Sequence, residues 1–325
     1  MIEEHGTARA EQAQPLQKSV EATGRRSALV SLGARLVREK PLGFAGAVIT
    51  LLLLIVGISA DVLAPYGFND VHLIDSLSPP SAQYLLGTDN LGRDLLSRII
   101  YGARISMIIG LAATSLSTII STVIGVASGY FGGFVDMVLQ RLVDAWMVFP
   151  GLVLLMAIIS LLGPGLWQII IVLGVSLGIG GSRVIRSAVM AIKENTYMEA
   201  ARAVGCSPMV IATRHILPNI MAPIIVLFST RVAGVILAEA SLSFLGLGIP
   251  PPVPSWGGML SGAGRTYMTR APWMAIWPGL ALTIVVYGVN MFGDAVRDLL
   301  DPRLRGGIGR YSGAKVKRER VAGGK

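Results

Sequence analysis

The chain has 325 residues, of which 53% are hydrophobic and 14% are charged, and its formal net charge is +9. A soluble domain carries about 25% charged residues, so soluble, disordered and fibrous classes fit poorly, and the composition indicates a protein that crosses a membrane several times. A single cysteine, Cys206, excludes an intramolecular disulfide.

The N-terminal part of the chain combines a polar tail with an apolar segment. Residues 1–40 carry charges of both signs without a helical or strand period, which predicts a disordered cytoplasmic tail. The apolar run begins near Leu42, too far along for a typical signal peptide. Residues 41–60 are uncharged and long enough to cross a hydrocarbon core of about 30 Å. We therefore expect residues 41–104 to form a first, uncleaved span and an external loop.

Further spans are expected where long stretches lack charge. Residues 145–182 are divided by Gly163-Pro164-Gly165, which predicts spans 3 and 4 as a hairpin with a short turn. The segments are too long and continuous for β-barrel strands of about 10 residues, so we predict an all-α fold with six transmembrane helices. Spans 2 to 6 form a five-helix core over 105–295 and lie within 105–135, the two halves of 145–182, 219–245 and 272–293.

Lysine and arginine are distributed unevenly between the two sides of the predicted membrane. With both termini in the cytoplasm, the inner side carries 22 of these residues and the outer side 5, and Arg231 lies within a span. This asymmetry predicts a multi-pass protein with both termini in the cytoplasm, including a tail over 296–325. It also places the positive excess beside membrane lipid, so nucleic acid is not needed as a partner.

Several kinds of catalytic chemistry lack the residues that they require. The chain has no G-x-x-x-x-G-K-[ST] loop for ATP and no H-E-x-x-H helix for zinc, so we expect no catalytic residue, metal or cofactor on this chain. Residues 125–129 read G-V-A-S-G, one residue too long for an intramembrane serine protease, and Ser128 is interpreted as a small residue for helix packing. Transport is favoured because the spans contain polar groups that would be costly in lipid.

The segment 194–218, between the fourth and fifth spans, is the most informative. Residues 196–204 suit a helix, and Gly205 can adopt the left-handed conformation that ends one. Ser207 is a candidate N-cap, and Pro208 suits the first position of a second short helix, which Pro218 would end. The residues predict a helix–glycine–helix unit against the membrane, which an ordinary amphipathic connector could also form.

The same segment resembles the E-A-A–x3–G–x9–I-x-L-P signature of permease subunits of bacterial ABC importers. The residues assigned to this ATPase-coupling loop are Glu199, Ala200, Ala201, Gly205, Ser207, Leu217 and Pro218. The stretches that resemble the oligopeptide and dipeptide branch are 87–94, 101–104, 141–150, 241–257 and 293–303. The resemblance covers about residues 40–305, and the short first external loop is similar to that of the C-type subunit of a two-permease heterodimer.

The resemblance implies a type I ABC importer permease fold in a bacterial cytoplasmic membrane, with a cytoplasmic coupling helix that docks on an ATPase. Implied partners are a second (B-type) permease subunit, two ATPase subunits that hold ATP and Mg, an extracytoplasmic solute-binding protein and a peptide substrate. Nickel, glutathione or another small solute is an alternative cargo in the same branch. A non-conducting membrane scaffold and a secondary transporter are alternatives from other functional classes.

Polar residues within the spans are candidates for the translocation path. Arg231 and Glu239 share a face of span 5 but are eight residues apart, about 12 Å along a helix, so we expect no direct contact. Arg231 could line the path or pair with another helix or the partner permease. Ser243 and Asn290 are the other candidates. Arg141 and Asp144 have the i,i+3 spacing of a local salt bridge at the cytoplasmic end of span 3.

Overall fold

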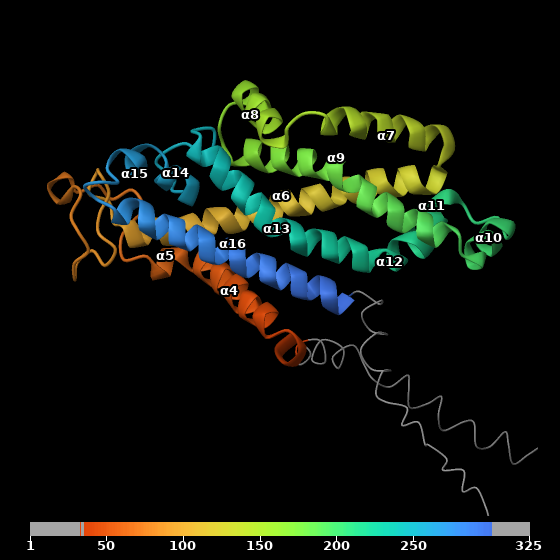
Figure 1. The fold of residues 1–325 in the computed structure, drawn as a ribbon, viewed down its shortest axis with the longest axis horizontal. Coiled ribbons are helices and arrows are strands. Elements are labelled where there is room, and N and C mark those ends of the chain that lie inside the picture. Colours follow the sequence, from red (N-terminus) through yellow and green to blue (C-terminus); the bar gives the residue numbers. More distant parts are fainter. Residues whose placement is uncertain (1–32, 34–35, 301–325) are drawn as a thin grey trace, which may run out of the picture.

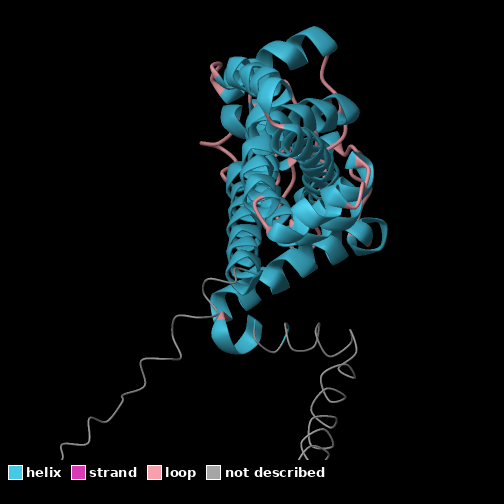
Figure 2. Cartoon of the chain, turned by 90° about the vertical axis from the view of Figure 1, so that its right-hand side faces the viewer, coloured by secondary structure: helices cyan, strands magenta, loops and turns pink. Residues whose placement is uncertain are grey.

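The computed structural model describes residue 33 and residues 36–300, so most of the predicted tails lies outside the described part. Within it the regular structure is helical, apart from one isolated bridge between Thr88 and Asp94 (Figures 1 and 2). The long helices are α4 (Pro41–Ile58), α6 (Leu95–Phe131), α7 (Gly133–Met147), α8 (Gly151–Leu162), α9 (Leu166–Lys193), α13 (Met221–Phe244) and α16 (Trp273–Leu300). The predicted all-α class is confirmed.

Short helices lie at both ends of this bundle (Figure 1). We call one end the α10 end, since it carries α10 (Thr196–Ala203), α11 (Pro208–Val210), the π-helix η2 (Ile211–Ile216) and α12 (Leu217–Asn219). We call the opposite end the α14 end, and it carries α5 (Ala60–Leu63), η1 (Leu73–Asp75), α14 (Trp256–Leu260) and α15 (Gly262–Thr266).

Five helices, α4, α6, α9, α13 and α16, are each long and apolar enough to cross a membrane, and α7 with α8 forms a sixth candidate bent by 87°. This pair runs from one end of the bundle to the other. At its start, a Cβ on Gly132 would lie 3.4 Å from Nζ of Lys193, at the α10 end. Just beyond α8, Pro164 lines a cavity at the α14 end. The bent pair therefore counts as one crossing, and the chain makes six.

The third span differs from the straight hairpin arm expected to start at residue 145. It begins at Gly133 and breaks between Met147 and Gly151. Pro150 has no backbone N–H and disfavours the helical conformation in Phe149, so α7 cannot continue directly into α8. The turn at Gly163 is as predicted, since Gly163 ends α8 with a φ of +83°.

The second span also differs from expectation, because α6 begins at Leu95 rather than after residue 104. The expected boundary rests on Arg98 and Arg104 as charges outside the span, but both side chains have partners in the preceding segments. Arg104 Nη2 lies 2.7 Å from Oδ2 of Asp61, and Arg98 Nη1 donates to the carbonyl of Phe68 at 2.9 Å. Because both arginines have hydrogen-bond partners, their charges do not prevent α6 from including them.

The contact between α6 and α9 is built on glycine. Gly125 and Gly129 of α6, and Gly174 and Gly178 of α9, form two G-x-x-x-G spacings. A Cβ on Gly125 would lie 2.7 Å from the carbonyl oxygen of Ser182, and one on Gly178 would lie 2.7 Å from Cβ of Ile120. Small residues let membrane helices approach closely enough to gain dispersion energy along their length. Ser128, also on α6, is fully buried, and its hydroxyl donates to Asp136 of α7.

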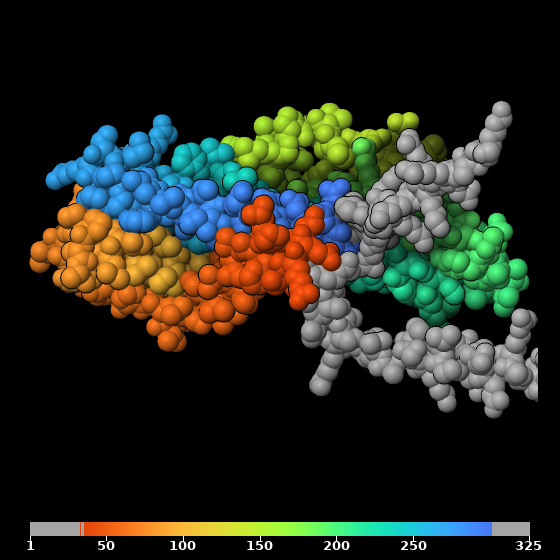
Figure 3. All heavy atoms as spheres, turned by 60° about the horizontal axis from the view of Figure 1, so that its bottom comes forward, coloured from red at the N-terminus to blue at the C-terminus, as the bar shows by residue number. Residues whose placement is uncertain are grey.

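The α4 and α16 helices lie side by side along one face (Figure 3). Lys40 Nζ lies 2.5 Å from Oδ2 of Asp298, which joins the start of α4 to the last turns of α16. The two ends of the described chain therefore lie on the same side of the bundle, as an even number of crossings requires.

Candidate functional site

The loop at the α10 end has the predicted helix–glycine–helix form. Gly205 has a φ of +83°, and its N–H donates to the carbonyl of Arg202 at 2.9 Å, which closes α10. Ser207 Oγ accepts the N–H of Val210 at 3.4 Å, and Pro208 is the first residue of α11. The structure confirms the helix stop, the cap and the second start.

The expectation that Pro218 ends the second helix is wrong. Pro218 lies inside α12, and the helical path continues through η2 and α12 before α13 begins at Met221. Proline lacks an N–H, and its ring crowds the carbonyl four residues earlier, at Arg214. A π-turn makes room for such a residue because it replaces i→i+4 bonds by i→i+5 bonds.

This loop has one face in the core and one face in the open. Met198 is fully buried, whereas Glu199 and Ala200, the next two residues, are exposed. The buried cluster around Met198 comprises Ile185, Val189, Ile211, Ile216, Ile220 and Leu227, with Val126, Tyr130 and Ala201 packed against it. The cluster therefore connects α10 to the ends of α6, α9 and α13.

A second contact holds α10 in the same place. The guanidinium of Arg202 lies over the ring of Tyr130, on α6, at 5.9 Å from its centroid. Gly205, Ser207 and Pro218 are exposed, and Leu217 is half-buried. Sequence reasoning missed Met198, although its i,i+3 spacing to Ala201 marks the buried side of this helix.

Arg231 of α13 lies between helices of its own chain. Its Nη1 donates to Ser117 Oγ at 2.7 Å and to the carbonyl of Leu177 at 2.9 Å. The guanidinium packs where a side chain on Gly181 would otherwise stand. Arg231 thus links α13 to α6 and α9, which is the geometry of a structural group.

Glu239 is also inside the subunit. It is fully buried, and its Oε1 accepts the hydroxyl of Ser243 at 2.6 Å, while no group in the described part of the chain hydrogen-bonds to its Oε2. Asn290 of α16 differs, because its side chain faces outward. The four residues predicted for the path therefore do not line one surface in this subunit.

Asn290 belongs to a polar stripe that the sequence reasoning did not recognise. The α16 residues that follow each other at spacings of three or four and are exposed are Thr283, Tyr287, Asn290, Asp294 and Arg297. This spacing places them on one helix face. It could have been read from the sequence alone, but the exposure of that face could not.

The Arg141 and Asp144 pair is looser than predicted. Their nearest charged atoms are 3.9 Å apart, and 80% of the Arg141 side chain is exposed. The carboxylate of Asp144 also bonds Arg183 of α9, at a shorter distance. About two turns earlier in α7, Asp136 Oδ1 accepts a hydrogen bond from Nε of Arg186 at 2.6 Å. Two ion pairs thus hold α7 against α9, with partners that the spacing in the sequence could not identify.

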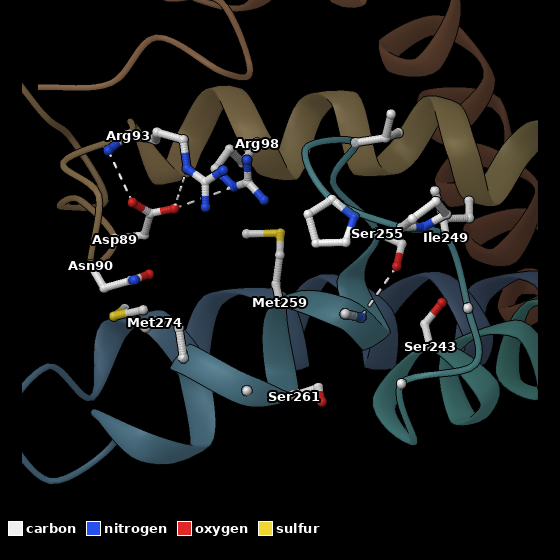
Figure 4. A pocket seen from close by; sticks show the side chains of 18 of the residues that line it. Asp89, Asn90, Arg93, Arg98, Ser243, Ile249, Ser255, Met259, Ser261 and Met274 are labelled. Atoms are coloured by element: carbon white, nitrogen blue, oxygen red, sulfur yellow. Dashed lines mark hydrogen bonds and ion pairs between the residues drawn. The ribbon is translucent and has the colours of Figure 1, made fainter. Parts of the chain in front are cut away.

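A cavity of about 600 Å³ opens at the α14 end (Figure 4). One wall carries Asp89, whose Oδ2 accepts Nε of Arg93 at 2.7 Å and lies 3.6 Å from Nε of Arg98. Figure 4 shows Ser243 and Ser261 across the cavity from these arginines, and Ser255 also lines it. Apolar lining comes from Leu91, Leu95, Ile249, Val253, Met259 and Met274. The cavity joins the segment before α6 to the segment after α13, which are about 150 residues apart in the chain.

The surrounding loops at this end are held by polar contacts. The Arg104 guanidinium bonds the carboxylate of Asp61 and, with the Tyr101 hydroxyl at 3.1 Å, holds the pKa of Asp61 below its ordinary value. Trp273 Nε1 donates to the carbonyl of Thr88 at 3.1 Å, beside the cavity wall. These contacts attach α5 to α6, and the loop before α6 to α16.

Residues 121–306, more than half of the chain, match the family described as binding-protein-dependent transport system inner membrane component. The chain belongs to this family. A peptide transport system permease protein of Brucella suis biovar 1 is 41% identical over 299 residues, which cover 91% of this chain and 98% of that protein. A glutathione transport system permease protein of Escherichia coli O157:H7 is 38% identical over 273 residues, which cover 84% of this chain and 90% of that protein.

Among solved structures, an inward-facing conformation of the MetNI methionine ABC transporter aligns with a TM-score of 0.47 and 18% identity, covering 63% of this chain and 96% of that one. The family membership makes this chain a membrane-embedded permease subunit of an ABC importer, in which separate ATPase subunits hydrolyse ATP. The scaffold and secondary-transporter alternatives are thereby excluded.

Proposed function

We propose that this permease is the C-type half of a heterodimeric pore that imports peptides. A B-type permease would complete the pore, two ATPases would bind ATP and Mg, and an external binding protein would deliver the solute. The observation that carries this proposal is the 41% identity to a peptide transport permease over 98% of that relative. Glutathione, itself a tripeptide, is a second candidate cargo because the Escherichia coli relative carries its name.

The α10 end is the proposed cytoplasmic end. Within the described residues, this end carries more cationic side chains than the α14 end, namely Arg38, Lys40, Arg141, Arg183, Arg186, Lys193, Arg202, Arg214 and Arg297, against Arg93, Arg98, Arg104, Arg265 and Arg270. The membrane-insertion rule places the side richer in lysine and arginine in the cytoplasm. Both tails would then leave from the cytoplasmic face of a bacterial cytoplasmic membrane.

The exposed face of α10 is the proposed docking site for an ATPase. Glu199 offers a charge and Ala200 a small surface that a groove can accommodate, while Met198 on the opposite face packs against three membrane helices. A displacement of α10 driven by nucleotide would therefore reach the cytoplasmic ends of α6, α9 and α13. Alternating access of the pore needs such a mechanical link between ATPase and spans.

The polar stripe on α16 is the proposed lining of the translocation path. It extends over the 15 residues from Thr283 to Arg297, about 21 Å along the helix. An asparagine that faces hydrocarbon is costly, so this face should meet water or protein. Asn290 and its neighbours are proposed for this role instead of Glu239, which is fully buried, and Arg231, whose guanidinium bonds α6 and α9 of its own subunit.

Transport by the complete complex in proteoliposomes tests the proposal. We expect ATP-dependent uptake of labelled Ala-Ala that requires the binding protein. Gly205→Val places a β-branched residue at a φ of +83°, a strain of order 1–3 kcal/mol, and should lower uptake at least tenfold. The matched control, Gly205→Asn, tolerates this conformation and should retain uptake within about twofold.

Two results would contradict this reading. Uptake that proceeds without the ATPases would exclude the importer mechanism. Uptake that is unchanged in Gly205→Val, at normal abundance of the complex, would remove the role assigned to the loop.

A further inference from the structure

The cavity at the α14 end is separate from both the coupling loop and the polar stripe. It lies between the segment that leads into α6 and the segments around α14 (Figure 4). Its volume, about 600 Å³, falls within the range of about 300–1,000 Å³ that is usual for small-molecule sites. Such sites combine apolar walls with a few placed polar groups, which is the composition found here.

The cavity lining contains two arginines but a single carboxylate, so its positive charge is only partly balanced. Arg93 and Arg98 both face Asp89, and no other charged residue lines the cavity. Asp94 is close in sequence, but it caps α6, where its Oδ2 accepts the N–H of Ser97 at 2.8 Å. The lining therefore carries one positive charge in excess.

The two arginines differ in how many of their side-chain N–H donors have a hydrogen-bond partner. Arg98 Nη1 donates to the carbonyls of Phe68 and Pro252, which gives it a structural role. Arg93 uses only its Nε, on Asp89, and its two terminal nitrogens hydrogen-bond no group in the described part of the chain. Yet only 11% of the Arg93 side chain is exposed. Arg93 lines the cavity, so these unused donors belong to the cavity wall.

The chemistry of this wall selects a carboxylate. A guanidinium presents parallel N–H donors that match the two oxygens of a carboxylate, and the bond is strengthened where apolar walls exclude water. Leu95, Met259 and Met274 supply such walls. On the opposite side Ser243 donates to the buried Glu239, so an acidic group stands behind the serine wall. The arginine wall attracts a carboxylate, and the serine wall with Glu239 behind it attracts an amino group. A zwitterion carries both groups and therefore suits this cavity.

We propose that this cavity binds the carboxylate of the imported solute through Arg93, before the solute enters the pore. The occupant is a small zwitterion of dipeptide size, with its carboxylate on Arg93 and its amino group toward Ser243. The identity of the occupant as cargo rests on the proposed function, whereas the carboxylate preference rests on the cavity itself.

Binding to the assembled transporter, in lipid nanodiscs without the binding protein, tests the proposal. The probes are Ala-Ala, its C-terminal amide and inorganic phosphate, followed by intrinsic tryptophan fluorescence, since Trp273 is bonded to the residue that precedes Asp89. We expect saturable binding of Ala-Ala and at least tenfold weaker binding of the amide and of phosphate.

Variants at two arginines assign that binding to the cavity. Arg93→Gln should weaken Ala-Ala binding at least tenfold and leave the weak binding of the amide unchanged. Arg270→Gln is the matched control, because Arg270 is exposed at the same end but does not line the cavity, and it should bind as the wild type does. Arg93→Lys, which keeps the charge without the planar fork, should assemble and lose affinity several-fold.

The proposal is overturned if Ala-Ala does not saturate, if the amide or phosphate binds as tightly, or if both Arg93 variants bind Ala-Ala like the wild type. ATP-driven uptake in the same preparation separates this result from the proposed function. If Ala-Ala is taken up but its binding does not depend on the carboxylate, the proposed cavity site is refuted and the proposed function stands. If binding depends on the carboxylate but no peptide is taken up, the proposed peptide cargo is refuted and the carboxylate preference of the cavity stands.

Discussion

Gly125→Ala should weaken the central contact between α6 and α9. The new Cβ would lie 2.7 Å from the carbonyl oxygen of Ser182 and 2.6 Å from Cβ of Ile185, whereas ordinary contact begins at 3.4 Å. Because the first of these neighbours is backbone, α9 must move by about 0.7 Å rather than rotate a side chain away. Overpacking of this kind costs about 1–3 kcal/mol.

The loss of stability in Gly125→Ala is compared with the same substitution at a glycine where an added Cβ would contact no other atom. Gly234 of α13 is exposed, and a Cβ there would meet nothing within 4 Å. Both substitutions gain the same helix propensity of about 1 kcal/mol, so the difference between Gly125→Ala and Gly234→Ala isolates the packing term. We expect that difference to be about 2 kcal/mol, close to a 30-fold change in the unfolding equilibrium.

Denaturation of the purified permease in mixed micelles by increasing SDS, followed by circular dichroism, gives this difference. Gly125→Ala should unfold at lower SDS than the wild type, and Gly234→Ala at the same concentration or higher. Equal midpoints for the two variants would refute the inference that close approach at Gly125 holds α6 against α9.

The remaining predictions concern an arginine inside the bundle, the polar stripe and the ion pair between Arg104 and Asp61 at the α14 end. Arg231→Leu removes the donors to Ser117 and Leu177, so the free energy of unfolding should fall by about 1–3 kcal/mol, which lowers the SDS midpoint and the abundance of the complex. Normal stability with altered solute selectivity would instead place Arg231 in the path. In a Cys206→Ser background, Asn290→Cys should react with a membrane-impermeant thiol reagent, whereas Ile119→Cys, which is 61% exposed on α6, should not; equal labelling would argue against a water-filled path along α16. Because Arg104 lowers the pKa of Asp61, their pair should stabilise the protein above about pH 4 and lose that effect as the pH falls through the lowered pKa. Asp61→Asn should abolish this part of the pH dependence of thermal unfolding, and a wild-type-like acid profile in the variant would contradict it.

Much of the architecture could be predicted from the sequence, because the relevant forces act locally. An uncharged run of about 20 residues must be helical in a membrane, since its backbone polar groups have no other partners there. The helix stop at Gly205 and the cap at Ser207 also follow from local backbone preferences, and both are found. The all-α class and the six crossings were accessible for this reason.

Boundaries and ion pairs were less predictable, since they depend on residues far along the chain. The start of α6 was missed because the charges of Arg98 and Arg104 are satisfied by other segments. Asp144 has its closer partner in Arg183, on another helix, rather than in Arg141. No spacing rule along one helix identifies such partners.

The sequence by itself therefore determined the number of spans, the form of the loop that precedes α13 and the resemblance to importer permeases. Tertiary structure alone decided that Arg231 faces its own subunit, that Asn290 faces outward and that Arg93 and Ser243 stand on opposite walls of one cavity. The physical reason is that hydrophobic length and backbone conformation are properties of neighbouring residues. The direction in which a polar side chain finds its partner is set instead by the packing of helices that are distant in the chain.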